Sequence, residues 1–455
     1  MLSSELRRRL EEHGQEHMIA AVEAVNGAEQ ATLVQQLEGI DFAELRTLYA
    51  KRDQKDALPE RSCIAKLPVP VSSEDERDAF WQTGEKAFMA GRVAFLMVAG
   101  GQGTRLGFDQ PKGVFPIGPV SKKPLFRIHA EKVIALNRRY GRRFPLLVMT
   151  SPATDSATRE YFRRKNFFRL PPEDVWFFCQ GTMPALDLAT GKLLLEAPGQ
   201  LCLSPDGHGG TITALASSGI LKRLQEQGIN TIYYFQVDNP LVNLADTTFL
   251  GRHQTHEAQV SSKVLPKAGP LERVGNFALV NGRCAMIEYS DLPKEWAHET
   301  DESGQLLFWA ANPAIHLFDV DFLGAIAKDV DRLPWHVARK KVPHVGNMQP
   351  ATENGLKFER FIFDALPQAE RWTVLPTERA DEFAPVKNKD GVDSPATARE
   401  LMSNQAVRWL RSLGVEVAEG ITVEIDPLLA MDMDGLQDQY RGPSRIDRNT
   451  YIKFK

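Results

Sequence analysis

The chain has 455 residues, of which 43% are hydrophobic and 25% charged, and its formal net charge is −4. This composition is typical of a globular protein with two or three domains. Basic residues are not in excess, which argues against a nucleic-acid partner. No apolar stretch is long enough to cross a bilayer. The first residues lack the apolar core of a secretory signal, and the four cysteines lack metal-ligand spacing, so we expect a cytoplasmic protein with reduced thiols.

The beginning of the chain has a helical pattern. Residues 3–50 repeat with a helical period, and their apolar stripe comprises Leu6, Leu10, Ile19 and Val22. Residues 51–71 are dotted with proline and lack a period, which is typical of a linker. A helix is expected to start near Ser73, where "SSEDERDAF" supplies a capping residue and first-turn acids. We predict a helical N-terminal region at residues 1–90.

From residue 92 onward, short apolar runs alternate with polar segments of helical period. The runs are "RVAFLMVAG", "FPLLVMTS", "DVWFFCQG" and "TIYYFQVDNP". Strands buried on both faces that alternate with helices predict a mostly parallel α/β sheet. From residue 259 the pattern indicates strands, with a hairpin at Asn281-Gly282. We predict a main domain at residues 91–375 and a small β-rich domain at residues 376–455, in which "MDMDG" reads as a solvated turn.

The stretch "LMVAGGQGTRLGFDQPKGVFPIG" at residues 96–118 joins a buried strand to glycines, an arginine and a lysine. In α/β folds, ligands bind at the carboxyl ends of strands. Glycines let backbone amides approach an anion closely, and Arg105 and Lys112 add full positive charges. The stretch therefore predicts a site for several phosphates, against the plainer reading of a tight turn with surface cations.

Two common phosphate-binding loops do not fit this stretch. The dinucleotide pattern GxGxxG fails because position 106 is leucine and the next glycine is Gly107. The P-loop GxxxxGK[ST] fails because no Gly-Lys-Ser/Thr occurs here.

"LMVAGGQGTRLG…QPKG" resembles the signature of the UDP-sugar pyrophosphorylases, in the branch that includes the UDP-N-acetylhexosamine enzymes (type 1 UDPGP uridylyltransferases). Further motifs of that family follow in its order, among them "LSPDGHGG", "YYFQVDNPLV" and "ADEFAPVKN". The likeness spans roughly residues 90–400. It implies a Rossmann-like, GT-A-like nucleotidyltransferase sheet and makes residues 91–375 the catalytic domain.

The resemblance implies that UTP and a sugar 1-phosphate, foremost N-acetylglucosamine 1-phosphate, react to a UDP-sugar and pyrophosphate. The attacking phosphate is already largely dianionic near neutrality, because its second pKa is about 6, so no general base is required. The obstacle is repulsion between polyanions, which positioning and cations overcome. Mg²⁺ is the cofactor expected for such chemistry.

The resemblance also implies the roles of particular residues. Gly100, Gly101, Gly103 and Thr104 would hold the nucleotide through their amides, Arg105 would face the leaving phosphates, and Lys112 would neutralise the α-phosphate. Gln180-Gly181 and Gly207 would read uracil, since an amide side chain matches its imide edge. His208 stands where relatives often carry asparagine, and a role for it as a base has little to favour it.

The metal ligand and the sugar contacts follow in the same way. Asp238 ends a strand, where an unpaired carboxylate is costly unless a cation compensates it; capping a helix is the alternative. Gly275, Glu288 and Asn312 match positions that contact the sugar, although Ala311 and Pro313 depart from the usual pattern there. Lys387, and also Lys357, would bind the sugar phosphate, against the plainer reading of solvated surface lysines.

Three other functions stay open at this point. Glucose or galactose 1-phosphate could replace the acetamido sugar as the acceptor. A glycosyltransferase that consumes a UDP-sugar would share the uridine-binding half of the sheet, but it predicts an Asp-x-Asp where this chain has Asp238-Asn239-Pro240. A nucleotide sensor without turnover would keep the fold but would not need Arg105 and Lys112. The oligomeric state is not predicted.

Overall fold

The computed structural model describes residues 2–54, 58–329 and 332–454. The chain folds into two compact units, each assembled from separated segments. Unit 1 comprises Met1–Pro59, Gln180–Thr213 and Val330–Asp364. Unit 2 comprises Glu60–Cys179, Ala214–Asp329 and Ala365–Lys455. The boundaries predicted near residues 90 and 375 stay a prediction.

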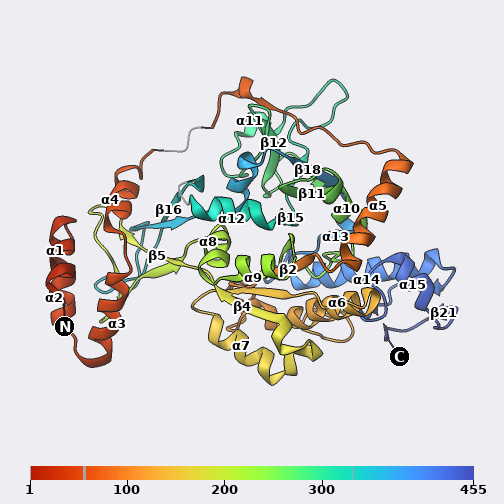
Figure 1. Cartoon of the computed structure of the whole chain (residues 1–455), viewed down its shortest axis with the longest axis horizontal. Helices are drawn as coiled ribbons and strands as arrows, with labels where there is room; N and C mark the ends of the chain where they lie inside the picture. Colours follow the sequence, from red (N-terminus) through yellow and green to blue (C-terminus); the bar gives the residue numbers. More distant parts are fainter. Residues whose placement is uncertain (1, 55–57, 330–331, 455) are drawn as a thin grey trace. The chain divides into compact units, whose positions relative to one another are not determined.

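Unit 2 is built on a large sheet, which Figure 1 shows with its covering helices. Among the described residues this sheet has 11 strands, in the order β1-β12-β14-β11-β15-β10-β2-β3-β4, with β13 on β12 and β18 on β11. Its strands are β1 (Ile64–Ala65), β2 (Val93–Val98), β3 (Leu146–Thr150), β4 (Val175–Cys179), β10 (Thr231–Gln236), β11 (Val260–Pro266), β12 (Asn276–Val280), β13 (Arg283–Ile287), β14 (Ala310–Ala311), β15 (His316–Asp319) and β18 (Trp372–Pro376).

The parallel sheet expected from the sequence is found in one half only. Strands β10, β2, β3 and β4 are parallel neighbours, as the four apolar runs predict. The strands beyond β10 pair mostly antiparallel, so the sheet as a whole is mixed rather than mostly parallel. One of these antiparallel pairs has a local cause: a two-residue turn with φ of 50° at Asn281 and 79° at Gly282 folds β13 back on β12, which confirms the predicted hairpin.

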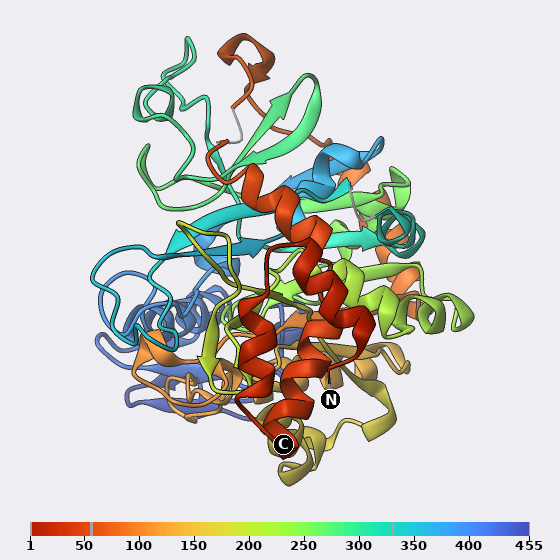
Figure 2. The same cartoon turned by 90° about the vertical axis from the view of Figure 1, so that its left-hand side faces the viewer.

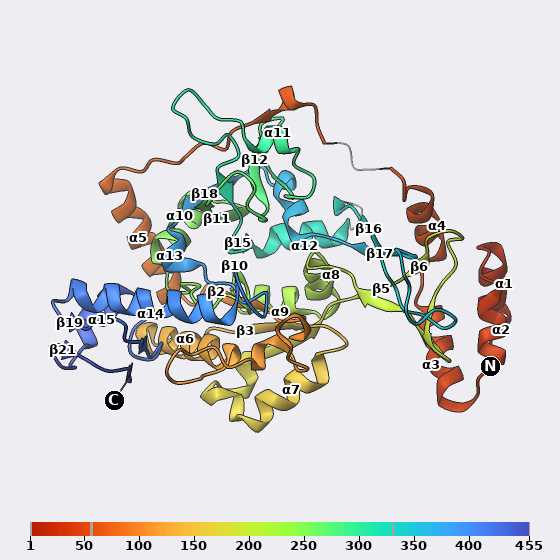
Figure 3. The ribbon, with the colours of Figure 1, turned by 180° about the vertical axis from the view of Figure 1, so that it is seen from behind.

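The helices of unit 2 are α5 (Glu74–Met89), α6 (Leu125–Tyr140), α7 (Asp155–Arg164), α9 (Ile220–Glu226), α10 (Thr247–Thr255), α11 (Lys294–Ala297), α12 (Val320–Lys328), α13 (Arg379–Glu382), α14 (Pro395–Ser412) and α15 (Met433–Gln439), while α8 (Gly210–Ser217) spans the division between the units. Ser73 caps α5 in a capping box with Glu76, which confirms the start predicted for that helix. Figure 3 shows α14 beside α6, and Ala398 of α14 belongs to the same buried core as Ile128 of α6.

Helices α5 and α10 pack with their backbones almost in contact. A Cβ atom at Gly84 would lie 1.9 Å from the carbonyl oxygen of Thr247, and one at Gly251 would lie 1.6 Å from that of Phe80. Both positions therefore require glycine, because any side chain would force the helices apart.

Unit 1 joins the N-terminal helices, shown in red in Figure 2, to short strands from later in the chain. Its core contains Leu6, Leu10, Ile19 and Val22, which confirms the predicted apolar stripe, together with Leu186 and Leu356 of the strands. Its elements are α1 (Ser4–Glu12), α2 (His17–Glu23), α3 (Gly27–Glu38), α4 (Phe42–Ala50), β5 (Thr182–Pro184), β6 (Leu186–Asp187), β7 (Leu195–Ala197), β8 (Gln200–Leu201), β9 (Leu203–Pro205), β16 (His336–Lys340) and β17 (Gly355–Glu359).

Two local predictions need correction. The predicted linker at residues 51–71 includes residues 55–57, which lie outside the described residues, but Ile64–Ala65 form β1 and pair with β12. "MDMDG" is not a solvated turn: Asp432 caps α15 and pairs with Arg139 at 2.6 Å. The tail also contains β19 (Glu416–Val417), β20 (Val423–Ile425), β21 (Arg445–Ile446) and β22 (Thr450–Ile452), which pair as β19-β21 and β20-β22.

Within the described residues, no helix is both long enough and apolar enough to span a membrane.

Candidate active site

The glycine-rich loop leaves the carboxyl end of β2, a strand that is buried along its whole length. Parallel strands β10 and β3 flank β2, so the loop lies where the ends of three parallel strands meet. Two internal hydrogen bonds close the loop: the amide of Lys112 donates to the carbonyl of Gly101 at 3.1 Å, and that of Gly103 to Gln110 at 3.0 Å. The sequence thus places an irregular but closed loop at the edge of the sheet.

The backbone amides of this loop are not all equally available. In the described part of the chain, no hydrogen-bond partner is found for the amides of Gly100, Gly101 and Thr104. The amide of Gly103 already donates to Gln110, and a Cβ atom at Gly103 would lie 2.7 Å from the carbonyl oxygen of Phe108. Gly103 is therefore required by packing, while the other three amides remain able to bind an anion.

The two predicted cations differ in their surroundings. Arg105 lies in the short helix η2 (Thr104–Leu106), is exposed, and has no carboxylate partner among the described residues. Lys112 begins the short helix η3 (Lys112–Val114), and its Nζ lies 3.0 Å from Oδ2 of Asp238. The side chains of this pair are 18% and 15% exposed, so solvent screens it only in part.

Asp238 follows β10 by two residues. Because β10 and β2 are parallel neighbours, the strand end that carries Asp238 lies beside the loop that carries Lys112. The carbonyl of Asp238 accepts from the amide of Val386 at 2.9 Å, and the side chain of Asn239 bonds the carbonyl of Glu382 at 2.7 Å. These bonds fix the "FAPVKN" segment, and with it Lys387, beside Asp238.

Lys387 is held loosely by comparison. Its side chain is 43% exposed, with Nζ 3.7 Å from Oδ2 of Asp393 and 5.5 Å from the centre of the Phe383 ring. Lys389, two residues further on, reaches back to the glycine loop, where its Cδ lies 4.0 Å from a Cβ built at Gly107. The sequence analysis missed Lys389, although the alternation in "VKNK" could have indicated it.

Carboxylates for a metal are sparse. In the described segments, no group of three or more His, Cys, Asp or Glu side chains is arranged to hold an ion. Asp238 is the acidic side chain in contact with Lys112, whereas Asp109 of the same loop is exposed. A single carboxylate matches a cation such as Mg²⁺, which takes one or two protein carboxylates and completes its shell with substrate phosphates and water.

The predicted sugar-contacting residues lie together around Met286. The amide of Asn312 donates to the carbonyl of Gly275 at 3.0 Å, and its Nδ2 lies 3.3 Å from the sulfur of Met286. A Cβ at Gly275 would lie 2.5 Å from that sulfur and 3.4 Å from Oε1 of Glu288. Strand register brings these residues together, because Asn276 pairs with both Ile287 of β13 and Ala311 of β14.

Unit 1 contains the residues predicted to read uracil. The Gln180 amide lies 3.4 Å from Oδ1 of Asp206 and 3.3 Å from the carbonyl of Gly207. Burial raises the pKa of Asp206. Gly207 has φ of 82°, and a Cβ there would lie 2.3 Å from the carbonyl oxygen of Arg360. Packing alone therefore explains this glycine.

His208 is a structural residue in this fold. Its Nδ1 accepts from the amide of Ile362 at 3.0 Å, and its ring centre lies 5.3 Å from that of Phe361 and 5.5 Å from that of Phe363. Burial lowers the pKa of His208 to about 4. A neutral ring whose Nδ1 already accepts a hydrogen bond has no role as a base through that atom. Lys357 lies on β17 of the same unit, with its charge near the Cys202 thiol.

Comparison with known proteins identifies a family for this chain. Residues 41–413 match the family described as UTP–glucose-1-phosphate uridylyltransferase. UDP-N-acetylglucosamine diphosphorylase 2 of Arabidopsis thaliana is 33% identical over 468 residues, which cover 96% of this chain and 91% of that protein. UDP-N-acetylglucosamine pyrophosphorylase of Saccharomyces cerevisiae is 36% identical over 388 residues, covering 82% of this chain and 80% of that protein.

A solved structure agrees with these sequence relatives. The uridine diphosphate N-acetylglucosamine pyrophosphorylase of Trypanosoma brucei, crystallised with an inhibitor, matches with a TM-score of 0.83 and 30% identity. The match covers 98% of this chain and 97% of that chain. The chain therefore belongs to the UTP–glucose-1-phosphate uridylyltransferase family.

Proposed function

We propose that this chain transfers the uridylyl group of UTP to N-acetylglucosamine 1-phosphate, forming UDP-N-acetylglucosamine and releasing pyrophosphate. The relatives in Arabidopsis and yeast, which are named for that activity, support the choice of sugar. The structural observation that carries the proposal is the contact between Lys112 and Asp238 at the glycine loop. Three backbone amides of this loop have no hydrogen-bond partner among the described residues.

The attacking oxygen belongs to the sugar phosphate, and the bond that breaks joins the α-phosphorus to the β-phosphate oxygen. The amides of Gly100, Gly101 and Thr104 hold the triphosphate, while Gly103 keeps the loop in shape. Lys112 faces the α-phosphate, where negative charge grows, and Arg105 faces the departing pyrophosphate. Lys387 holds the phosphate of the sugar; the family resemblance implies a phosphate contact for Lys357 of unit 1 as well.

Uracil and the sugar are bound by residues in the roles that the family resemblance implies. Gln180, Gly181 and Gly207 bind uracil, and Gly275, Glu288 and Asn312 bind the sugar. Mg²⁺, when bound through Asp238, supplies positive charge to the phosphates and screens their repulsion. Asp238 would hold the metal, and Lys112, which lies beside Asp238, faces the α-phosphate. The parallel strands β10, β2, β3 and β4 serve as the Rossmann-like, GT-A-like nucleotide-binding core.

The test is pyrophosphate release from UTP and Mg²⁺ with a panel of sugar 1-phosphates. We expect N-acetylglucosamine 1-phosphate to be the preferred acceptor. If only glucose or galactose 1-phosphate reacts, the proposed sugar is wrong but the reaction class stands; the family description, which names glucose 1-phosphate, makes this the second candidate.

The reverse reaction tests the reaction class itself. UDP-N-acetylglucosamine and pyrophosphate should regenerate UTP. A glycosyltransferase would not do so, and binding of both compounds without turnover would identify a sensor instead.

A further inference from the structure

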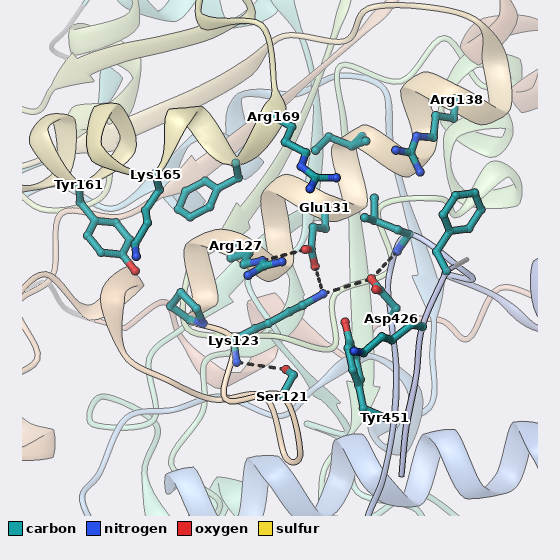
Figure 4. A pocket seen from close by; sticks show the side chains of 16 residues that line it. Ser121, Lys123, Arg127, Glu131, Arg138, Tyr161, Lys165, Arg169, Asp426 and Tyr451 are labelled. Carbon is teal, nitrogen blue, oxygen red and sulfur yellow. Dashed lines mark hydrogen bonds and ion pairs between the residues drawn. The ribbon is translucent and has the colours of Figure 1, made fainter.

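A cavity of about 930 Å³ lies in unit 2 beside α6, and none of its lining residues belongs to the glycine loop or to the Asp238 strand end. Four segments form its wall: residues 121–138, which include most of α6, residues 161–169 at and after the end of α7, and two C-terminal segments at 426–428 and 451–454. Figure 4 shows that Arg127, Arg138 and Arg169 lie around Glu131, and that Lys123 lies between Glu131 and Asp426.

The acidic side chains of this cavity are already neutralised. Lys123, which is 6% exposed, places Nζ 2.6 Å from Oε2 of Glu131 and 3.2 Å from Oδ1 of Asp426. Arg127 donates from Nε to Oε1 of Glu131 at 2.9 Å. Two cations thus offset the two carboxylates, and any further cation in the wall adds net positive charge.

Four further cations line the same cavity: Arg138, Lys165, Arg169 and Lys453. None of them has a carboxylate partner in the described part of the chain. Arg138, Lys165 and Lys453 instead lie 5.0 to 5.9 Å from the ring centres of Phe454, Tyr161 and Tyr451. An excess of four positive charges around one cavity is notable because the whole chain carries a net charge of −4.

The backbone that carries Arg169 has an uncommon conformation. Four consecutive residues that are not glycine have positive φ: 47° at Asn166, 47° at Phe167, 54° at Phe168 and 77° at Arg169. Residues other than glycine rarely adopt positive φ. Such backbone conformations persist only where the surrounding structure enforces them, often at ligand sites. Here the turn buries Phe168 against Phe162 and leaves Lys165 and Arg169 exposed at the cavity.

We propose that this cavity is a second anion-binding site, which takes a small molecule carrying two or more phosphate groups. The four unpaired cations bind the phosphates, and Tyr161, Phe168 and Phe454 supply an apolar wall for the rest of the ligand. The site is independent of the proposed reaction, since it shares no residue with the groups assigned to UTP or to the sugar.

The experiment uses inorganic tripolyphosphate as the probe and isothermal titration calorimetry as the readout, with the full chain. Four proteins are compared: wild type, a cavity variant (Arg138→Ala with Arg169→Ala), a surface control (Arg46→Ala with Arg77→Ala), and Arg105→Ala at the glycine loop. All four arginines of the two double variants are exposed, so these variants should fold alike. Uridylyl transfer by the double variants checks this directly.

Binding should weaken about tenfold or more in the cavity variant, and should remain near the wild-type affinity in the surface control and in Arg105→Ala. It should also weaken with rising salt, because the cations are partly open to solvent. Three outcomes would overturn the proposal: no binding to the wild type, equal weakening in the cavity variant and the surface control, or loss confined to Arg105→Ala. The last outcome would place the probe at the catalytic loop.

Discussion

At the scale of single residues, the Lys112–Asp238 contact is the feature to which the proposed reaction assigns the largest electrostatic role. The two partly buried opposite charges, 3.0 Å apart, compensate each other. In the proposed reaction Lys112 faces the α-phosphate and Asp238 would hold the metal, so each side chain would have a second counter-charge. The pair thus holds both groups in place, ready for substrate, without leaving either charge unpaired.

Lys112→Ala should lower kcat by a factor on the order of 10²–10³, because the positive charge acts on the α-phosphate as charge grows there. UTP affinity should fall much less, since the ground state makes weaker use of that charge. Steady-state kinetics and UTP titration calorimetry measure the two effects separately. The control is Lys122→Ala, which removes a nearby lysine whose Nζ donates to the carbonyl of Pro119. Equal losses in kcat and affinity would remove Lys112 from the proposed role.

Asp238→Asn should raise the Mg²⁺ concentration needed for half-maximal activity, because an amide oxygen binds the ion more weakly than a carboxylate. The asparagine oxygen can still accept from Lys112, so the fold should survive. Activity is titrated with Mg²⁺ in this variant and in Asp109→Asn, an exposed carboxylate of the glycine loop. A titration curve identical to that of the wild type would show that Asp238 does not hold the metal.

At the scale of elements, α6 supports the strand end that carries Asp238. His129 of α6 lies 2.9 Å from the carbonyl of Val237, and Nζ of Lys132 donates to the carbonyls of Pro240 and Val242, each at 2.6 Å. Burial lowers the pKa of Lys132 to about 7. Both side chains are buried, so one helix face satisfies three carbonyls that would otherwise lack partners on either side of Asp238.

The contact between α5 and α10 gives a sharp stability prediction. Gly84→Ala should lower the free energy of unfolding by about 1–3 kcal/mol, because the new methyl group meets the backbone of Thr247. Gly324→Ala is the matched control: this glycine lies in α12 with nothing within 4 Å of its Cβ position. There the same change should raise stability by about 0.5–1 kcal/mol. Urea unfolding measures both, and changes of the same sign would refute the packing argument.

The elements were predictable from the sequence where one local rule decides them. Four apolar runs gave the four parallel strands, Asn281-Gly282 gave the hairpin, and Ser73 gave a helix start. The pairing of β14 and of β1 with β12, and the ion pair of Asp432 with Arg139, depend on partners far away in the chain. Sequence patterns over a few residues contain no information about such partners. The cap at Asp432 is local, because its side chain accepts from the amide of Gly435, and the sequence analysis missed it.

The proximity of Lys112 and Asp238 was predictable for a related reason. Asp238 and Lys112 could be placed near each other because both follow parallel strands or their loops, whose ends share one edge of the sheet. Lys132 and His129 could not, because on α6 they look like interruptions of an amphipathic helix. Only their contacts with the carbonyls after β10 explain why these two polar side chains are buried there.

At the scale of the whole molecule, buried histidines set the response to acid. Burial lowers the pKa of His129 and of His253 to about 3, and that of His208 to about 4. In the unfolded chain the imidazole pKa is about 6.5. Between these values the unfolded state binds protons that the folded state does not. The stability that these histidines contribute is therefore fully present above about pH 6.5 and is lost as the pH falls toward 3–4.

Unfolding in urea at pH 7.5 and pH 5.0 should accordingly show a lower free energy of unfolding at pH 5.0, with a slope of at most about 1.4 kcal/mol per pH unit for each such histidine. His129→Gln, which can still donate to the carbonyl of Val237, should flatten that dependence. His298→Gln, at an exposed histidine, should leave it as in the wild type. A pH dependence unaffected by His129→Gln would assign the acid sensitivity to other groups.

The crowding of Gly207 against Arg360 has a consequence for how such chains are recognised. The glycines of "PDGHGG" leave no room for a side chain, since Cβ atoms at Gly207, Gly209 and Gly210 would lie 2.1 to 2.6 Å from neighbouring atoms. A related chain without catalytic activity would still need these three glycines in order to fold. A sequence signature dominated by these glycines would therefore also match inactive relatives, and the charged positions 105, 112 and 238, to which the proposed reaction assigns catalytic roles, are the better criterion if that proposal holds in the kinetic tests above.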